Sequence, residues 1–173
     1  NNIFMKIYDN YLSDEEFSKI ENFIEDSSFQ WSLVKQLNSN SKPGDFVFIH
    51  ESSDKEKSNS VFTLLIKKIF NKNDFSDGTS KKIQIGRMRV NLFINTDNKN
   101  EGKGFHQDII NDDDMKTLLF YLEDSNGYTE FKDGGIVESK KNRAVIFNSN
   151  VLHQTVMQTD TIFRRNININ FKF

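Results

Sequence analysis

Residues 164–171 read Arg-Arg-Asn-Ile-Asn-Ile-Asn-Phe, and this alternation decides the fold class. Side chains of a β-strand point alternately to opposite faces, so Arg164 and the three asparagines share one face, whereas Arg165, the two isoleucines and Phe171 share the other. The polar face of an interior strand must be satisfied by water, a metal or a ligand, so the pattern predicts a wet cavity between two sheets. A strand whose polar face meets solvent is the alternative that the pattern alone leaves open.

The chain before this strand, from residue 82 onward, consists of short β-type segments broken by Gly, Asn and Asp. About eight strands at this spacing are typical of a sandwich or barrel. We therefore predict a mainly β protein, a double-stranded β-helix (jelly roll) of two antiparallel sheets. The expected strands are 83–94, 105–109, 117–122, 128–131, 135–138, 144–147, 153–157 and 163–173.

The N-terminal part of the chain has helical patterns instead. Ser13 and Glu16 have the spacing of a capping box, and apolar residues follow every three or four positions. A broad apolar stripe predicts a second helix over 60–71. We expect two or more N-terminal helices, packed on the outer face of one sheet.

Length and composition support one folded domain. The chain has 173 residues, of which 17 are Phe, enough to build a packed interior. We expect a single domain over 1–173, with a helical support region over 1–82 and a jelly-roll catalytic core over 83–173. Because the chain contains no Cys, disulfides, thiolate metal sites and cysteine nucleophiles are excluded. Any metal must bind to His, Asp or Glu, and there are 3 His.

The charge balance bears on partners. A formal net charge of −2 gives no global field that would attract nucleic acid or an anionic membrane. No apolar run is long enough to span a bilayer, and the first residues lack a signal-peptide pattern. We expect a cytoplasmic protein, of a microbe or of a virus-infected host cell, that is a monomer or homodimer and has neither nucleic acid nor a membrane as partner.

Four residues have side chains that together could form a metal-dependent site. In the expected strand 105–109, His106 and Asp108 share a face, and His153 follows a later apolar strand. Two imidazoles and one carboxylate are the ligand set of non-haem Fe(II) oxygenases, which leaves three metal positions open. A 2-oxo acid can occupy two of them and dioxygen the third. Arg164 is positioned to bind the far carboxylate of such a cosubstrate, because a guanidinium grips carboxylates in a planar fork.

With these residues in place, the chain resembles the Fe(II)- and 2-oxoglutarate-dependent dioxygenases, close to their prolyl-4-hydroxylase-like branch and its small phage-type members. The resemblance covers nearly the whole chain. Its motifs are Arg-Val-Asn-Leu (89–92), Gly-Phe-His-Gln-Asp (104–108), Thr-Leu-Leu-Phe-Tyr-Leu (117–122), Asn-Gly-Tyr-Thr-Glu-Phe (126–131), Asn-Arg-Ala-Val-Ile-Phe-Asn-Ser (142–149) and Leu-His (152–153).

The resemblance implies a role for each matching residue. It implies that His106, Asp108 and His153 hold the iron, and that Arg164 and Tyr121 bind the distal carboxylate of 2-oxoglutarate. It also implies Asn91, Asn168 and Thr117 as cosubstrate-side residues. Arg165 is the alternative anchor, but choosing it would turn the apolar face of the last strand toward the wet cavity. The implied cofactors are Fe(II), 2-oxoglutarate and O₂, with ascorbate as an optional addition.

The implied reaction is hydroxylation of a C–H bond with release of succinate and CO₂. We expect a peptidyl substrate, with prolyl as one option, or a small molecule. Oxidative demethylation of nucleic acid is disfavoured, because related demethylases resemble one another in a second arginine where this chain has Asn170. The alternatives are a non-catalytic jelly-roll binding or structural module and a cupin-like metal isomerase. Only the oxygenase requires the three metal-binding side chains to converge with Arg164 facing them.

Overall fold

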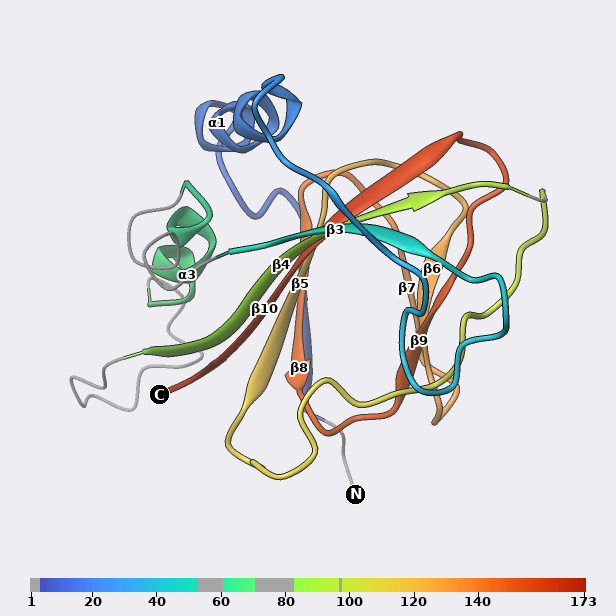
Figure 1. Cartoon of the computed structure of the whole chain (residues 1–173). Coiled ribbons are helices and arrows are strands. Elements are labelled where there is room, and N and C mark those ends of the chain that lie inside the picture. Colours follow the sequence, from blue (N-terminus) through green and yellow to red (C-terminus); the bar gives the residue numbers. More distant parts are fainter. Residues whose placement is uncertain (1–3, 53–60, 71–82, 97) are drawn as a thin grey trace.

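The computed structural model describes residues 4–52, 61–70, 83–96 and 98–173. The strands are β1 (Met5–Tyr8), β2 (Ser32–Val34), β3 (Val47–Glu51), β4 (Gln84–Ile94), β5 (Lys116–Tyr121), β6 (Tyr128–Phe131), β7 (Ile136–Glu138), β8 (Arg143–Asn148), β9 (His153–Val156) and β10 (Phe163–Lys172). They form a seven-stranded sheet in the order β1-β8-β5-β10-β4-β3-β2 and a three-stranded sheet in the order β7-β6-β9 (Figure 1). All these pairings are antiparallel, so the mainly β jelly-roll prediction is confirmed.

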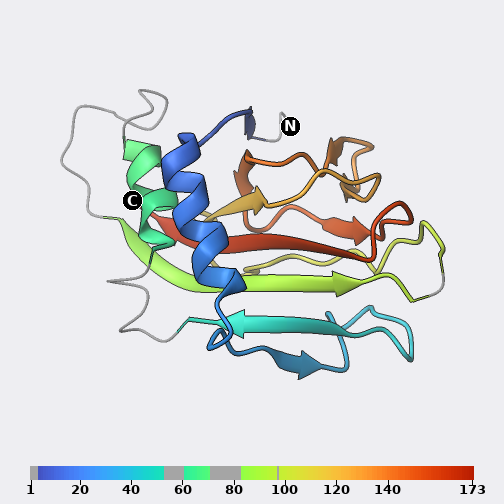
Figure 2. The same cartoon turned by 90° about the horizontal axis from the view of Figure 1, so that it is seen from above.

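Helices α1 (Asp14–Glu25) and α3 (Thr63–Phe70) cover one face of the seven-stranded sheet, and the three-stranded sheet faces the other (Figures 1 and 2). α1 begins as the sequence predicts. The Ser13 hydroxyl accepts the Glu16 backbone N–H, and the Glu16 carboxylate accepts the Ser13 N–H at 2.9 Å. The second predicted helix is present over 63–70, residues 61 and 62 form a turn before it, and residues 60 and 71 lie outside the described residues.

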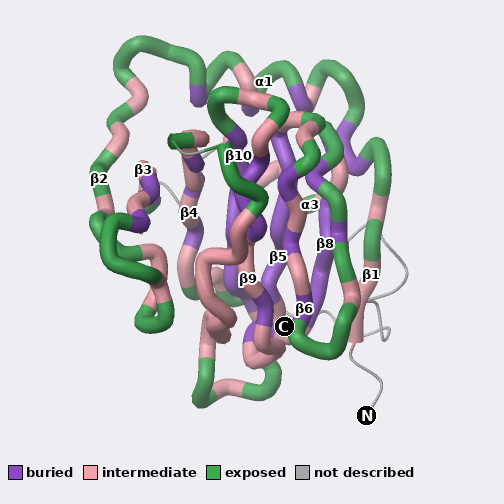
Figure 3. The backbone as a smooth tube through the Cα atoms, turned by 90° about the vertical axis from the view of Figure 1, so that its right-hand side faces the viewer, coloured by how far each residue is buried: buried purple, intermediate pink, exposed green. Residues whose placement is uncertain are grey.

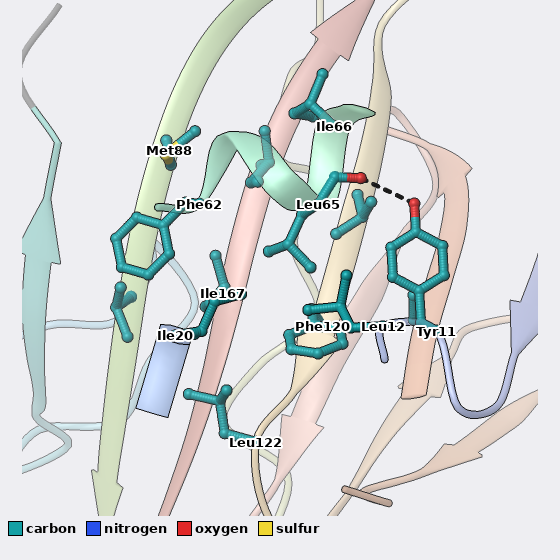
Figure 4. Packing of buried hydrophobic residues seen from close by; sticks show 14 of the residues in the cluster. Tyr11, Leu12, Ile20, Phe62, Leu65, Ile66, Met88, Phe120, Leu122 and Ile167 are labelled. Atoms are coloured by element: carbon teal, nitrogen blue, oxygen red, sulfur yellow. Dashed lines mark hydrogen bonds between the residues drawn. The ribbon is translucent and has the colours of Figure 1, made fainter. Parts of the chain in front are cut away.

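The main hydrophobic core fills the space between the helices and the large sheet (Figure 4). Phe62, which directly precedes α3, Leu65 of α3 and Ile20 of α1 are fully buried there against residues of the central strands. The Tyr11 hydroxyl donates to the backbone carbonyl of Leu65 at 2.9 Å, which satisfies the one polar atom that this tyrosine brings into the core. The helices therefore stabilise the sheet from its outer face and leave the inner face free for a site.

Strand β10 decides which face is which. Its apolar residues Ile167, Ile169 and Phe171 belong to the helix-side core, as the alternation predicts. Its polar residues are also buried, so almost the whole strand lies inside the protein (Figure 3). The polar face therefore lies between the sheets and not in solvent, which settles the alternative left open by the pattern. β10 pairs with β4 on one side and β5 on the other.

Two expectations differ from the structure. Residues 105–109 are not a strand, because only an isolated bridge joins His106 to His153. The 1–82 region is not purely helical, since β1 pairs with β8 and β3 pairs with β4 in the large sheet. Short apolar runs give no decisive periodicity, so sequence alone does not separate such strands from loops. Among the described helices, none is long and apolar enough to cross a membrane.

Candidate active site

A cavity of about 410 Å³ opens on the inner face of the large sheet, a size suited to small ligands. It is mixed in character, with polar side chains from β4 and β10 and apolar ones such as Phe93 and Leu119. Its wall is formed by Leu37, Asn38, Ser39, Asn40, Val47, Arg87, Arg89, Asn91, Phe93, His106, Gln107, Asp108, Ile110, Leu119, Thr129, Leu152, His153, Thr155, Asn166 and Asn168.

All three predicted metal-binding residues converge on this wall. One potential ligand atom from each of His106, Asp108 and His153 lies within 4.8 Å of the others. The His106 Nε2 is 3.9 Å from the Asp108 Oδ1, and the two imidazole centroids are 4.6 Å apart. A pair of backbone hydrogen bonds, His106 N–H to His153 O and His153 N–H to His106 O, ties the two segments together. This isolated bridge holds His106 beside His153, where a full strand was expected.

The imidazoles are arranged as metal ligands require. The His153 Nδ1 lies 2.9 Å from the Val151 carbonyl, which can only accept, so Nδ1 carries the proton and Nε2 keeps its lone pair. The His106 Nδ1 lies 3.3 Å from the Gly104 carbonyl. Burial and the neighbouring His153 lower the pKa of His106, which favours the neutral ring. A neutral imidazole is the form that binds a metal.

Asp108 is held as an anion by its surroundings. Its side chain is only 2% exposed, and burial alone would raise its pKa. Electrostatic interactions with the His153 ring and the Arg87 guanidinium, a hydrogen bond from Asn168 and the interaction with the His106 ring outweigh that effect, and together they lower the pKa to about 2. Oδ2 accepts from the Thr117 hydroxyl at 2.8 Å and from the Asn168 amide at 3.1 Å. Oδ1 is the oxygen that faces His106.

This donor set fits a divalent first-row metal. It offers one ring nitrogen from each of two imidazoles and one carboxylate, whose Oδ2 is held by the Thr117 hydroxyl and the Asn168 amide. The three protein ligands would occupy one side of a bound metal, and the cavity lies on its other side. The metal would therefore keep coordination positions for additional ligands. Its chemistry therefore allows a metal to be bound at His106, Asp108 and His153.

Arg164 lies behind the wall of the same cavity. Its side chain is fully buried, its Nη2 donates to the Thr155 hydroxyl, and its guanidinium carbon lies 5.3 Å from the Phe93 ring centroid. Within the described residues, its Nε and Nη1 are buried without a hydrogen-bond partner. Burial lowers the pKa of Arg164 to about 10, so it remains a cation at neutral pH. A buried guanidinium with two donor atoms that lack a partner among the described residues is chemically suited to bind a carboxylate.

Gly127 makes room for this guanidinium. A Cβ at residue 127 would lie 2.9 Å from the Arg164 Nη1 and 3.0 Å from the backbone nitrogen of Gln158. Both separations are too short for an unstrained side chain, so a larger residue at this position would displace the arginine.

The remaining predicted cosubstrate residues fall into two groups. Tyr121 is fully buried beside the cavity and donates to the Thr129 hydroxyl at 2.7 Å, and burial raises the pKa of Tyr121 to about 12. Asn91 lines the cavity and donates to the Asn166 side chain at 2.8 Å.

Thr117 and Asn168 instead contact the Asp108 carboxylate directly. Because Thr117 forms no part of the cavity wall, its role in the structure is to orient Asp108. Its assignment as a cosubstrate-side residue stays a prediction.

Arg165, the alternative anchor, faces away from the cavity. Its Nε donates to the Glu123 carboxylate, and its Nη2 lies 3.4 Å from Glu25 of α1. It therefore belongs to the layer of helix contacts, as the apolar alternation of its strand predicts.

Several cavity residues were not identified from the sequence. The Asn38 side-chain amide donates to the Lys103 carbonyl at 3.2 Å and lies 3.3 Å from the His106 Nδ1. Arg87 forms an ion pair with Asp108 at 3.1 Å, and Arg89 also lines the cavity. The alternation of polar residues in 87–93 contained a signal for the two arginines, whereas no local pattern connects Asn38 with a residue 68 positions away.

Comparison with known proteins finds similarity in the fold. No protein-family model matches the sequence, and no curated protein sequence matches it. Solved structures do match. The 2-oxoglutarate complex of a viral collagen prolyl hydroxylase from Paramecium Bursaria Chlorella virus-1 is 16% identical, with a TM-score of 0.66 over 98% of this chain and 96% of that one.

Two further structures widen the comparison. A prolyl-4-hydroxylase from Pseudomonas putida has a TM-score of 0.62 at 14% identity, over 99% of this chain and 93% of that one. The non-haem α-ketoglutarate-dependent epimerase SnoN of nogalamycin biosynthesis has a TM-score of 0.69 at 11% identity, over 98% and 78%. At these identities the similarity concerns the fold. The chain therefore has the jelly-roll fold of the 2-oxoglutarate- and Fe(II)-dependent oxygenases, among them viral and bacterial prolyl hydroxylases.

Proposed function

We propose that this protein is an Fe(II)- and 2-oxoglutarate-dependent dioxygenase that hydroxylates a C–H bond of a peptidyl substrate, with prolyl as one option, or of a small molecule. The observation that carries the proposal is the convergence of His106, Asp108 and His153 on one cavity wall. Two donor atoms of Arg164, which have no partner among the residues that the structure describes, support it independently.

Each residue has a defined task in this proposal. His106 and His153 bind the metal through Nε2, and Asp108 binds it through the oxygen that faces His106. Arg164 and Tyr121 bind the distal carboxylate of 2-oxoglutarate, which gives the two orphan guanidinium donors their acceptor. When bound, Fe(II) and 2-oxoglutarate supply the oxidising chemistry, in which O₂ is consumed, succinate and CO₂ are released, and a C–H bond becomes C–OH.

The protein contributes geometry and exclusion of water. Thr117 and Asn168 fix the Asp108 carboxylate, so the ligand oxygen is oriented before a metal arrives. Phe93, Leu119 and Leu152 provide apolar wall next to the metal-binding residues. A cavity lined in this way limits the access of bulk water to a reactive centre.

The decisive experiment is anaerobic addition of Fe(II) and 2-oxoglutarate to the purified protein, recorded by visible absorption spectroscopy. We expect a metal-to-ligand charge-transfer band in the wild type and none in Asp108→Ala. Asp133→Ala, which removes an exposed turn carboxylate, is the matched control and should keep the band. Absence of the band in the intact protein would contradict the proposal and favour a non-catalytic jelly-roll module.

The epimerase among the similar structures makes product analysis necessary, because a 2-oxoglutarate-dependent centre on this fold is described there with an outcome other than hydroxylation. Succinate formation in the presence of O₂ and ascorbate separates the oxygenase class from a cupin-like metal isomerase. An isomerase would keep its activity in Arg164→Met, whereas the proposed enzyme loses 2-oxoglutarate turnover in that variant.

A further inference from the structure

The mouth of the cavity carries more positive than negative charge. Arg87 and Arg89 alternate with Met88 along β4, so both side chains lie on the cavity side of the sheet. Among the described residues that line the cavity, Asp108 is the one acidic residue. The proposed function assigns tasks to Asp108 and Arg164 but none to the two arginines of β4.

Arg87 pairs with Asp108, which is also a proposed metal ligand. Its Nη2 lies 3.1 Å from the Asp108 Oδ1, the oxygen that is also 3.9 Å from the His106 Nε2 and faces the metal-binding residues. A metal held by His106, Asp108 and His153 would compete with the Arg87 guanidinium for this carboxylate. The Arg87 Nε is buried and has no hydrogen-bond partner within the described part of the chain. Arg87 therefore keeps donor capacity for another anion.

Among the described residues, the acidic partner of Arg89 is Glu51, at the rim of the cavity. Its Nη2 lies 2.8 Å from the Oε2 of Glu51, whose side chain is 48% exposed. Solvent-exposed pairs of this kind contribute little and exchange readily for a better acceptor. The Arg89 Nε, like that of Arg87, is buried without a hydrogen-bond partner among the described residues.

These arginines do not duplicate the site of Arg164. In the β10–β4 register Arg164 lies opposite Phe93, whereas Arg89 lies opposite Asn168, four residues further along the strand. Four residues of strand correspond to about 13 Å. In the proposed site, the metal and Arg164 bind the two carboxylates of 2-oxoglutarate. The negative charges of Asp108 and 2-oxoglutarate together balance the positive charges of a divalent metal and Arg164. A positive charge remains at the mouth of the loaded site.

We infer that the substrate carries an oxyanion, a carboxylate or a phosphate, which Arg87 and Arg89 bind at the cavity mouth next to the metal. This inference rests on the proposed function and names the substrate class of that site. Two guanidinium forks suit either anion, because each presents parallel N–H donors to two oxygens. The pair would orient the substrate so that a carbon near its anionic group faces the metal.

The test uses the whole protein loaded with Mn(II) and 2-oxoglutarate, with inorganic phosphate and acetate as probes. The paramagnetic enhancement of ³¹P relaxation in phosphate, and of ¹³C relaxation in acetate, reports binding close to the metal. We expect saturable enhancement for at least one probe in the wild type. Arg87→Gln and Arg89→Gln should each weaken that binding by about tenfold or more, since hydrogen bonds to charged groups are lost. Lys42→Gln, which removes an exposed cation that is paired with Glu101 and does not line the cavity, is the matched control and should not change it.

The outcomes separate the inference from the proposed function. Enhancement by acetate identifies a carboxylate site, and enhancement by phosphate identifies a phosphate site. If neither probe saturates, or if both arginine variants bind like the wild type, the inference is wrong while the proposed function stands. The Mn(II) electron paramagnetic resonance signal is recorded in the same samples and in Asp108→Ala. If the wild type does not bind Mn(II) through Asp108, the proposed function fails, and the inference fails with it.

Discussion

Replacing Arg164 with Met should make the protein more stable and unable to bind its cosubstrate. Burial lowers the pKa of this guanidinium from 12.5 to about 10. Each factor of ten in acidity corresponds to about 1.4 kcal/mol, so holding the charged form in the folded protein costs about 3 kcal/mol. Met removes that cost and keeps much of the packing against Phe93. Loss of the hydrogen bond to Thr155 cancels about 1.5 kcal/mol of this stabilisation, so the free energy of unfolding should rise by about 1–2 kcal/mol.

The neighbouring Arg165 provides a matched control. This arginine is paired with Glu123 and Glu25, so Arg165→Met leaves the half-buried Glu123 carboxylate without its main cation. Truncating one partner of a buried pair costs about 3 kcal/mol or more. The two adjacent substitutions should therefore change the free energy of unfolding in opposite directions.

The assay is urea denaturation at pH 7, with and without Mn(II) and 2-oxoglutarate. A ligand at about 100 times its dissociation constant stabilises the folded state by about 2.7 kcal/mol, so the wild type and Arg165→Met should both be stabilised when ligands are added. Arg164→Met should show the stabilisation by Mn(II) and no further increase with 2-oxoglutarate. If Arg164→Met is less stable than the wild type and still responds to 2-oxoglutarate, the assignment of Arg164 as an unsatisfied carboxylate anchor is refuted.

Three further predictions test the surroundings of the site. The pKa of Asp108 is lowered from 3.8 to about 2, so its contribution of about 2 kcal/mol is present above pH 4 and lost as the pH falls through 2. Asp108→Asn should lower the free energy of unfolding by about that amount at pH 7, and should make this free energy depend less on pH in the acid range. A urea midpoint equal to that of the wild type at pH 7 and at acidic pH would contradict this. Thr117→Val removes the hydroxyl that donates to Asp108 and should weaken Mn(II) binding by about 10- to 100-fold in calorimetric titration, with the fold preserved by circular dichroism. Gly127→Ala should weaken 2-oxoglutarate binding but not Mn(II) binding, because its Cβ would crowd the Arg164 guanidinium; Gly135→Ala, which meets no atom closer than 3.5 Å, is the control, and equal 2-oxoglutarate affinities in the two variants would oppose the reasoning.

The fold class and the main site residues were predictable because strong local patterns report them. The alternation in 164–171 distinguishes an apolar face from a polar one, and burial of both faces follows from the position of β10 between β4 and β5. The same alternation assigned Arg164, and not Arg165, to the inner face. The capping box at Ser13 is equally local, since its hydrogen bonds span three residues.

Features that depend on pairing between distant segments were not predictable in the same way. The segment 105–109 was expected to be a strand, whereas it is held by one bridge to His153 and by a hydrogen bond from the Asp108 N–H to the Ser149 carbonyl. The three short strands within 1–82 escaped detection, since a run of three to five residues has no distinctive period.

The sequence by itself determined the mainly β architecture, the chemistry of the His106, Asp108 and His153 donor set, and the inward direction of Arg164. Only the tertiary structure decided that Thr117 orients Asp108 and does not line the cavity, that Arg87 shares the Asp108 carboxylate, and that Asn38 reaches His106. The physical reason is the separation along the chain over which each kind of interaction acts. Side-chain alternation and helix capping act between neighbours in the chain, whereas the contacts that tune a site join residues whose distance is set by the packing of the whole sheet.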